Sequence, residues 1–273
     1  MKIKTILKMI ERKKMNVKGK KCAGRETGQG RLESYFRFFP HALGIVAVFT
    51  YVLFTNDHLG GADSGELIGT SYKWGVAHPP GYPLYITLSK IFSLISPFES
   101  VIYTYNLFST LCFLGSLYFM YRACRYLNIH PAAISAVGAL YIFSPLNLRW
   151  MTTAEVFALH ILVCSIGMWL TCRIIAKGGL DKASCLLGLV AGLGASNHHT
   201  IIFLFPGFFL VYFYFWFKLD SNAGRFSELL RLIGFTLLGF AFYLQPVLSS
   251  VLQEQPVSCL GLEITSFQDL VNL

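Results

Sequence analysis

A polar stretch follows directly after the first hydrophobic segment of the sequence. Asp63 and Glu66 lie three residues apart, and His78 begins the run His-Pro-Pro-Gly-Tyr-Pro that ends at Pro83. Ionisable groups at the edge of a membrane span are costly to keep, so they are functional candidates by default. Two carboxylates and an imidazole at this position indicate acid–base chemistry or the binding of a polar substrate.

Asp63 and Glu66 share one face of a helix if a helix begins at Asp63, because residues three apart are neighbours on a helix surface. A carboxylate at this place is a candidate general base, with its pKa raised by the membrane edge or lowered by a nearby cation. The alternative is that Asp63 or Ser64 only caps a helix that runs to Trp74. The two interpretations are compatible with each other.

The proline-rich turn after His78 predicts a rigid backbone. Pro79 and Pro80 fix φ, Gly81 permits a tight turn, and Pro83 suits the first turn of the next helix. We expect this turn to hold His78 close to the preceding helix, where its imidazole can bind a phosphate or shuttle a proton. A histidine that only hydrogen-bonds locally is the alternative.

Further candidates lie between later spans, on the side where the topology also places His78. Arg149 is a candidate phosphate clamp, and its alternatives are an ion pair with Glu155 or snorkelling into lipid headgroups. Glu155, His198 and His199 are candidate ligands of a polar substrate or its phosphate, with helix capping by Asn197 as the alternative for the histidine pair. Adjacent histidines lack the helical spacing of metal ligands, so no metal site is predicted, and dependence on a divalent metal is left open.

Composition indicates which elements position these groups. Of the 273 residues, 54% are hydrophobic and 14% are charged, whereas soluble domains are about 25% charged. Apolar runs of about 20 residues, long enough to cross a bilayer, recur along the chain. They predict an all-α polytopic membrane protein with about seven transmembrane helices and lumenal juxtamembrane helices. The expected spans are residues 40–57, 101–121, 131–146, 155–172, 184–196, 200–217 and 229–246.

The segment 84–98 is short for a span and carries Lys90 at its centre, so we expect an interfacial helix. Charge counting supports this choice. If 84–98 does not cross, eight Lys and Arg residues of the later loops lie on the side of the N-terminus, and three lie on the far side. If 84–98 crosses the membrane, the eight Lys and Arg residues lie on the side opposite the N-terminus, against the positive-inside rule.

Three regions are predicted along the chain. Residues 1–39 form a basic cytoplasmic segment, since residues 1–37 contain 12 of the 23 Lys and Arg residues, and this segment is suited to contact anionic lipid. Residues 40–250 form the transmembrane domain, with a first lumenal loop at 58–100. Residues 251–273 form a short divergent tail. The basic segment lacks interleaved aromatic residues, so nucleic acid is not an expected partner.

Two residue classes receive no chemical role. The aromatic residues between Phe208 and Phe217 are expected to face lipid and to form an interface belt. The seven cysteines form no CxxC pair, and most lie in or beside apolar spans. We therefore expect neither a disulfide framework nor a zinc site.

The order of these features resembles the GT-C superfold of membrane glycosyltransferases. More closely, the sequence resembles the transmembrane protein 260 type of protein O-mannosyltransferase over about residues 40–250. The first motif blocks are the most specific, and Tyr243-Leu244 with Ser249-Ser250 is a looser match. The matching blocks are Asp63-Ser64-Gly65-Glu66-Leu67, Gly75-Val76-Ala77-His78-Pro79-Pro80-Gly81-Tyr82-Pro83, Ala154-Glu155-Val156-Phe157 and Asn197-His198-His199-Thr200-Ile201-Ile202.

The resemblance implies an enzyme of the endoplasmic reticulum membrane that transfers mannose from dolichyl-phosphate mannose to Ser or Thr hydroxyls. The acceptors in this family are immunoglobulin-like, plexin, transcription-factor (IPT) domains of receptors. Asp63 is then the base of an inverting transfer through an oxocarbenium-like transition state, and Glu66 orients the acceptor or supports Asp63. His78 and His198 or His199 offset the charge of the leaving phosphate, and topology adds Arg149 to this set.

Two alternatives accompany this hypothesis. Members of the family continue into further spans and a lumenal helical-repeat domain, whereas this sequence ends at Leu273. A shortened, non-catalytic form that binds lipid-linked sugar or a full-length partner is therefore one alternative. A transporter or channel is the other, although the sequence shows neither an inverted repeat nor paired broken helices.

Overall fold

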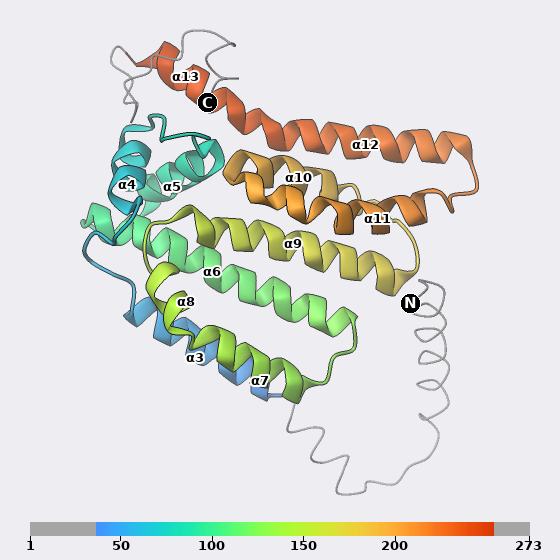
Figure 1. Cartoon of the computed structure of the whole chain (residues 1–273), viewed down its shortest axis with the longest axis horizontal. Helices are drawn as coiled ribbons and strands as arrows, with labels where there is room; N and C mark the ends of the chain where they lie inside the picture. Colours follow the sequence, from blue (N-terminus) through green and yellow to red (C-terminus); the bar gives the residue numbers. More distant parts are fainter. Residues whose placement is uncertain (1–36, 254–273) are drawn as a thin grey trace, which may run out of the picture.

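The computed structural model describes residues 37–253, which form helices and connecting loops without a β-strand in that range (Figure 1). The basic segment and the tail predicted from the sequence lie almost entirely outside the described residues. Proline occupies the first turn of five helices, as expected for a residue that lacks an amide donor. The helices, with η marking 3-10 turns, are α3 (Phe39–Leu53), α4 (Ser64–Lys73), α5 (Pro83–Ile95), α6 (Val101–Tyr126), α7 (Pro131–Ile142), α8 (Pro145–Trp150), α9 (Val156–Lys177), α10 (Leu186–Asn197), η2 (His199–Phe203), α11 (Phe205–Trp216), α12 (Asn222–Phe240), η3 (Ala241–Tyr243) and α13 (Leu244–Leu252).

The helices are those of a membrane protein. Three helical segments are long and apolar enough to cross a bilayer, namely α6, α9 and the continuous stretch Asn222–Leu252. Helices α3, α5, α7, α10 and α11 are apolar but shorter. The predicted count of seven spans is therefore not confirmed, whereas the all-α class is.

The predicted single span over residues 200–217 is wrong in one respect. The chain first forms the short turn η2 and then starts α11 with Pro206 in its first turn. Proline has no amide hydrogen to donate to the preceding turn, so it favours a new helix start over the continuation of an old one.

The aromatic residues of α11 also differ from the prediction. Phe208, Tyr212 and Phe215 are buried rather than exposed to lipid. Their spacing puts them on one helix face, which packs against α9. A Cβ at Gly167 of α9 would lie 2.6 Å from the Phe208 ring, so the glycine makes room for this contact.

Helices α10 and α12 lie against each other along a seam of small residues (Figure 1). A Cβ at Gly192 would overlap the carbonyl oxygen of Thr236, and one at Gly239 would lie 2.6 Å from the amide nitrogen of Leu193. The Ser196 hydroxyl lies 3.1 Å from the carbonyl oxygen of Gly239 and donates to it. This close approach fixes the end of α10 that leads into His198.

Helices α4, α5 and α13 gather at one end of the bundle (Figure 1). Side chains of α13 and of the residue after it donate to carbonyl groups at the end of α4 and just beyond it, which the helix itself leaves without partners. The contacts are Gln245 Nε2 to the Gly75 oxygen (2.8 Å), Ser249 Oγ to the Trp74 oxygen (2.7 Å) and Gln253 Nε2 to the Lys73 oxygen (3.0 Å). The beginning of α4, at this same end, contains the acidic motif.

Candidate functional site

Helix α4 begins as the sequence predicts, but the side chain of Asp63 makes no hydrogen bond to its first turn. Asp63 occupies the N-cap position, and its side chain makes no capping hydrogen bond. The hydroxyl of Ser64 donates to the carbonyl oxygen of Gly60 at 2.9 Å. The position expected for a cap is therefore confirmed, but the side chain does not act as one, and the half-exposed Asp63 carboxylate lies 3.9 Å from Nε2 of His78.

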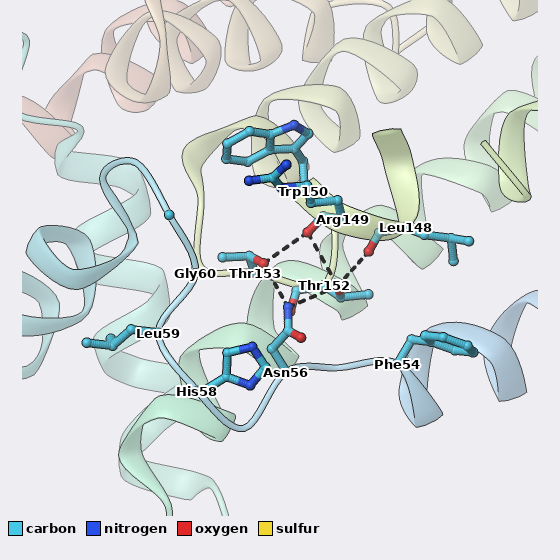
Figure 2. Close-up of a pocket in the computed structure, with 11 residues that line it drawn as sticks. Phe54, Asn56, His58, Leu59, Gly60, Leu148, Arg149, Trp150, Thr152 and Thr153 are labelled. Carbon is cyan, nitrogen blue, oxygen red and sulfur yellow. Dashed lines mark hydrogen bonds between the residues drawn. The ribbon is translucent and has the colours of Figure 1, made fainter. Parts of the chain in front are cut away.

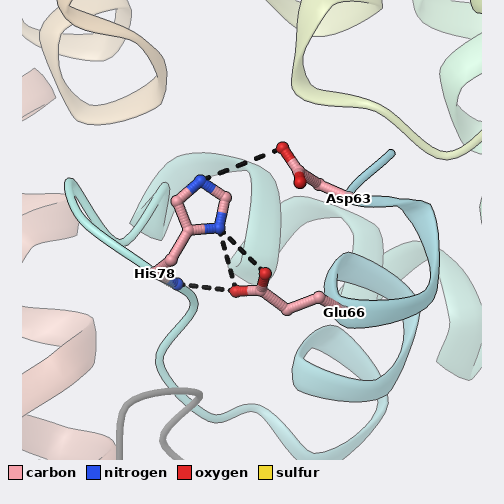
Figure 3. A group of neighbouring side chains, drawn as sticks. All are labelled: Asp63, Glu66 and His78. Carbon is pink, nitrogen blue, oxygen red and sulfur yellow. Dashed lines mark hydrogen bonds and ion pairs between the residues drawn. The ribbon is translucent and has the colours of Figure 1, made fainter. Parts of the chain in front are cut away.

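His78 is held by Glu66 through its backbone and its ring (Figure 3). Its amide donates to Glu66 Oε1 at 2.7 Å, and its Nδ1 lies 2.9 Å and 3.0 Å from the two carboxylate oxygens. Because a carboxylate accepts, Nδ1 must bear a proton, which leaves Nε2 of the neutral ring as an acceptor. The prediction that the turn keeps His78 close to the preceding helix is confirmed.

Tyr82 joins this group from the rigid turn, and the sequence analysis did not identify it. Its hydroxyl lies 3.0 Å from His78 Nε2, and its backbone is left-handed with φ of 46°. Burial raises the pKa of Tyr82, as do the nearby charges of Asp63, Glu66 and Glu155. The phenol is therefore a hydrogen donor to Nε2.

Glu155 brings a third carboxylate to the same place. It immediately precedes α9, is 1% exposed, and its Oε1 has no hydrogen-bond partner among the described residues. Burial raises its pKa to about 7, assisted by the charge of Asp63 and opposed by the Asp63 backbone amide and by His78. We call Asp63, Glu66 and Glu155 around His78 the acidic cluster.

Two buried polar residues of α6 position this cluster. Asn106 donates to the carbonyl oxygens of Asn56 (2.8 Å) and His58 (3.2 Å), and its Oδ1 accepts from the amide of Ala154 (2.7 Å). The Ser109 hydroxyl accepts from the amide nitrogen of Glu155 at 3.3 Å. The sequence analysis missed both residues, and their signal was polar side chains at helical spacing in an apolar span.

A second group of polar side chains lies on the other side of Tyr82. The Tyr82 ring stacks on His198 with centroids 6.0 Å apart, and the His160 ring lies 5.3 Å from the same histidine. The Thr200 hydroxyl lies 2.8 Å from His198 Nδ1 and 3.1 Å from His160 Nε2. We call His160, His198 and Thr200 the imidazole cluster. Burial and the neighbouring His199 lower the pKa of His198.

The residues beside His198 make different contacts. His199 is exposed, and its Nε2 lies 3.3 Å from the hydroxyl of Tyr243. Asn197 ends α10, and its Nδ2 donates to the carbonyl oxygen of Val156 at 3.2 Å. Asn197 therefore ties α10 to the start of α9, and the capping role that was its alternative is wrong.

Arg149 lies in a separate pocket of about 390 Å³ (Figure 2). Its guanidinium carbon is 5.2 Å from the centroid of the Trp150 ring, and the ion pairs of residues 37–253 do not include Arg149. The alternative of an ion pair with Glu155 is therefore wrong. Gly60 and Gly61 line this pocket and lead to Asp63, so the arginine flanks the acidic cluster without joining it.

The acidic cluster also has the spacing of a metal site. Asp63, Glu66 and His78 each offer one ligand atom, and these atoms lie within 4.8 Å of one another. Carboxylate oxygens with one imidazole suit a divalent cation such as Mn²⁺ or Zn²⁺. These are the residues that would hold one here.

Comparison with known proteins gives a consistent set of relatives. The family described as Protein O-mannosyl-transferase TMEM260 N-terminal domain matches residues 63–221. Protein O-mannosyl-transferase TMEM260 of Mus musculus is 39% identical over 163 residues, which are 58% of this chain and 23% of the mouse protein. Protein O-mannosyl-transferase tmem260 of Dictyostelium discoideum is 28% identical over 204 residues, 68% of this chain and 24% of that protein. The chain thus spans about a quarter of the length of these relatives. No solved structure matches it significantly.

Proposed function

The chain belongs to the family of the Protein O-mannosyl-transferase TMEM260 N-terminal domain, and from this premise we propose that it contains the catalytic site of a membrane O-mannosyltransferase. The proposed donor is dolichyl-phosphate mannose, and the proposed acceptors are Ser or Thr hydroxyls of IPT domains in the lumen of the endoplasmic reticulum. The N-terminus is then cytoplasmic, and the GT-C arrangement predicted from the sequence belongs to the same proposal.

The observation that supports this function best is the convergence of Asp63, Glu66 and Glu155 around one imidazole. Asp63 is the most exposed of the three carboxylates and makes no capping bond, so it is free to approach a hydroxyl. In our proposal Asp63 removes the acceptor proton as the oxygen attacks the anomeric carbon. The bond from that carbon to the phosphate oxygen breaks, and configuration inverts.

The other side chains of the acidic cluster have supporting roles in this proposal. Glu66 fixes the position and tautomer of His78, as a carboxylate does in other catalytic pairs. Tyr82 donates to His78 Nε2. The charge that develops on the leaving phosphate is offset by imidazoles or by Arg149. These four candidates, His78, Arg149, His198 and His199, fall in different parts of the site. In this proposal the buried Glu155 contacts the substrate through Oε1, which has no hydrogen-bond partner among the described residues.

The test is mannose transfer from labelled dolichyl-phosphate mannose to a receptor IPT domain by the purified 273-residue chain. The variant is Asp63→Asn, which keeps the shape of the side chain and removes the base. Asp57→Asn is the matched control, because Asp57 is an exposed carboxylate on the same loop whose partner is its neighbour His58. Removal of a general base lowers rates by about 10²–10⁴-fold.

We expect transfer by the unchanged chain and by Asp57→Asn, and its loss in Asp63→Asn. Full activity of Asp63→Asn would remove Asp63 as the base. Absence of transfer by the unchanged chain, in a preparation that is folded by its melting curve, would reject the proposal that this segment alone is catalytic.

A further inference from the structure

The imidazole cluster lies partly within a helix that is long enough to cross the membrane. His160 follows Val156, the first residue of α9, by four positions, which is about 6 Å along the helix. Its Nδ1 is buried without a hydrogen-bond partner in the described part of the chain. An ionisable side chain with one ring nitrogen left unpaired at such a depth is a candidate ligand.

The charges of the two clusters differ in a way that decides where an anion binds. The acidic cluster has three carboxylates around one imidazole, and these repel a phosphate. In the described part of the chain, Nε2 of His160 lies 3.1 Å from the Thr200 hydroxyl and 3.5 Å from the Cys164 thiol, and no carboxylate forms a hydrogen bond with it. A phosphate is therefore better accommodated at the imidazole cluster.

Exposed apolar side chains lie beside this cluster or follow it directly in the sequence. Phe157, whose ring centroid lies 5.8 Å from that of His198, is 44% exposed. Ile202 and Phe203 follow Thr200 in η2 and are 59% and 80% exposed. In a membrane protein such a surface faces acyl or prenyl chains rather than water. The surroundings therefore suit a phosphate that is attached to a lipid.

We propose that His160, His198 and Thr200 bind the phosphate of a polyprenyl phosphate that enters from the bilayer, with its chain along Phe157, Ile202 and Phe203. The proposal rests on the proposed function for the identity of the lipid, but binding of the lipid phosphate is measurable without transfer. The Tyr82 ring, which contacts both His198 and His78, then separates the phosphate from the acidic cluster. The sugar bond that breaks lies between the two clusters.

A purely structural role for His160 makes a different prediction. The contacts from His198 through Thr200 to His160 would then only fasten η2 to α9. Removing His160 would lower the melting temperature, and lipid binding would not depend on the phosphate group. The experiment must therefore measure phosphate-dependent binding and folding in the same samples.

The full 273-residue chain in lipid nanodiscs is titrated with dolichyl phosphate and, separately, with dolichol, which has the same chain without the phosphate. The variant is His160→Leu, which keeps an apolar helix and removes both ring nitrogens. The matched control is His41→Leu, because His41 also contacts a hydroxyl, that of Tyr121 at 3.3 Å, far from this cluster. A hydrogen bond to a charged group is worth about tenfold or more in affinity.

We expect the unchanged chain and His41→Leu to bind dolichyl phosphate more tightly than dolichol, and His160→Leu to lose at least about tenfold of this preference. A folded His160→Leu variant with an unchanged preference would overturn the subsite and leave the transfer proposal intact. Equal binding of both lipids by the unchanged chain would also overturn it, while the transfer assay judges the function separately. If His160→Leu does not fold, Thr200→Val is the deciding variant, because it removes one hydroxyl and keeps the packing of the rings. An unchanged preference of Thr200→Val for dolichyl phosphate over dolichol would then reject the subsite.

Discussion

The acidic and imidazole clusters are neighbours in space but are assembled in different ways. Three of the four residues of the acidic cluster, Asp63, Glu66 and His78, lie within one short stretch, placed by the start of α4 and by the turn that follows it. His160 and Thr200 are 40 residues apart and meet only because α9 packs beside α10 and η2. The first arrangement depends on local backbone geometry, and the second depends on how the helices pack. Substitutions should therefore affect the two clusters differently.

The largest expected effect is the pH dependence of stability due to Glu155. Its pKa in the folded chain, about 7, lies above the ordinary value of 4.5. As the pH rises through this window the unfolded chain loses the proton first, so folding stability falls, by on the order of 3 kcal/mol in total. Glu155→Gln should lack this decline, which melting curves in detergent from pH 4 to pH 8 will show.

The same measurement sharpens the comparison between the clusters. Asp63→Asn removes a negative charge that raises the pKa of Glu155 in the folded chain, so in that variant the decline should end at lower pH and be smaller, while its onset, set by the unfolded chain, stays the same. His160→Leu should leave the window unchanged. Identical profiles for the unchanged chain and Glu155→Gln would show that Glu155 ionises normally and does not belong to a buried acidic cluster.

Glu66→Ala should lower mannose transfer by about 10–100-fold, since hydrogen bonds to a charged group are worth about 1.5–3 kcal/mol. The variant releases both the amide and the Nδ1 of His78. Binding of dolichyl phosphate should change much less, because the imidazole cluster keeps its contacts. Equal losses of transfer and lipid binding would mean that the two clusters do not act separately.

Addition of EDTA to the unchanged chain distinguishes two roles of Glu66. A hydrogen-bonding clamp on His78 predicts unchanged transfer after chelation. Loss of transfer that Mn²⁺ restores would instead identify Glu66, with Asp63 and His78, as ligands of a cation.

Gly192→Ala tests whether helix packing holds the imidazole cluster in place. The added methyl group meets the backbone of α12, and overpacking of this kind costs about 1–3 kcal/mol. We expect a lower melting temperature together with weaker dolichyl phosphate binding. Gly234→Ala is the control, because a Cβ at Gly234 of α12 meets open space. Equal behaviour of the two variants would show that the seam does not position His198.

The smallest expected effect is that of Arg149→Gln. Arg149 is exposed and lies in its own pocket beside the acidic cluster, so solvent weakens its attraction for a phosphate. We expect transfer to fall by about 3–10-fold, a loss of roughly 1 kcal/mol. A loss of dolichyl phosphate binding as large as that of His160→Leu would place the phosphate between the pocket and the imidazoles.

Hydropathy predicted the helices well in segments whose apolar length alone distinguishes a membrane span from a shorter helix. The segment predicted at 101–121 begins at Val101 as expected, and the short segment 84–98 forms α5, which is among the shorter apolar helices. Hydropathy does not tell whether an apolar side chain faces lipid or the protein interior, because both surroundings are apolar. The burial of Phe208 and its neighbours could therefore not be predicted.

The site was predictable to the extent that it is local. Helical spacing and the proline-rich turn were sufficient to bring Glu66 and His78 together. Neither His160 nor Asn106 was assigned, because helical spacing marks the face on which a polar residue lies but not its partner on another helix. Arg149 and Glu155 were both proposed as ligands, but spacing alone also suggested an ion pair between them, whereas Arg149 lies over the Trp150 ring and Glu155 is buried.

The contacts of α13 with the end of α4 bear on the design of fragments. Residues 244–253 lie beyond the segment 63–221 that the family shares, yet Gln245, Ser249 and Gln253 supply donors to the last carbonyl groups of α4. An expression boundary drawn at residue 221 would leave those oxygens to water and would loosen the helix whose other end begins at Asp63. The shortest piece worth purifying for structural work therefore extends through Gln253.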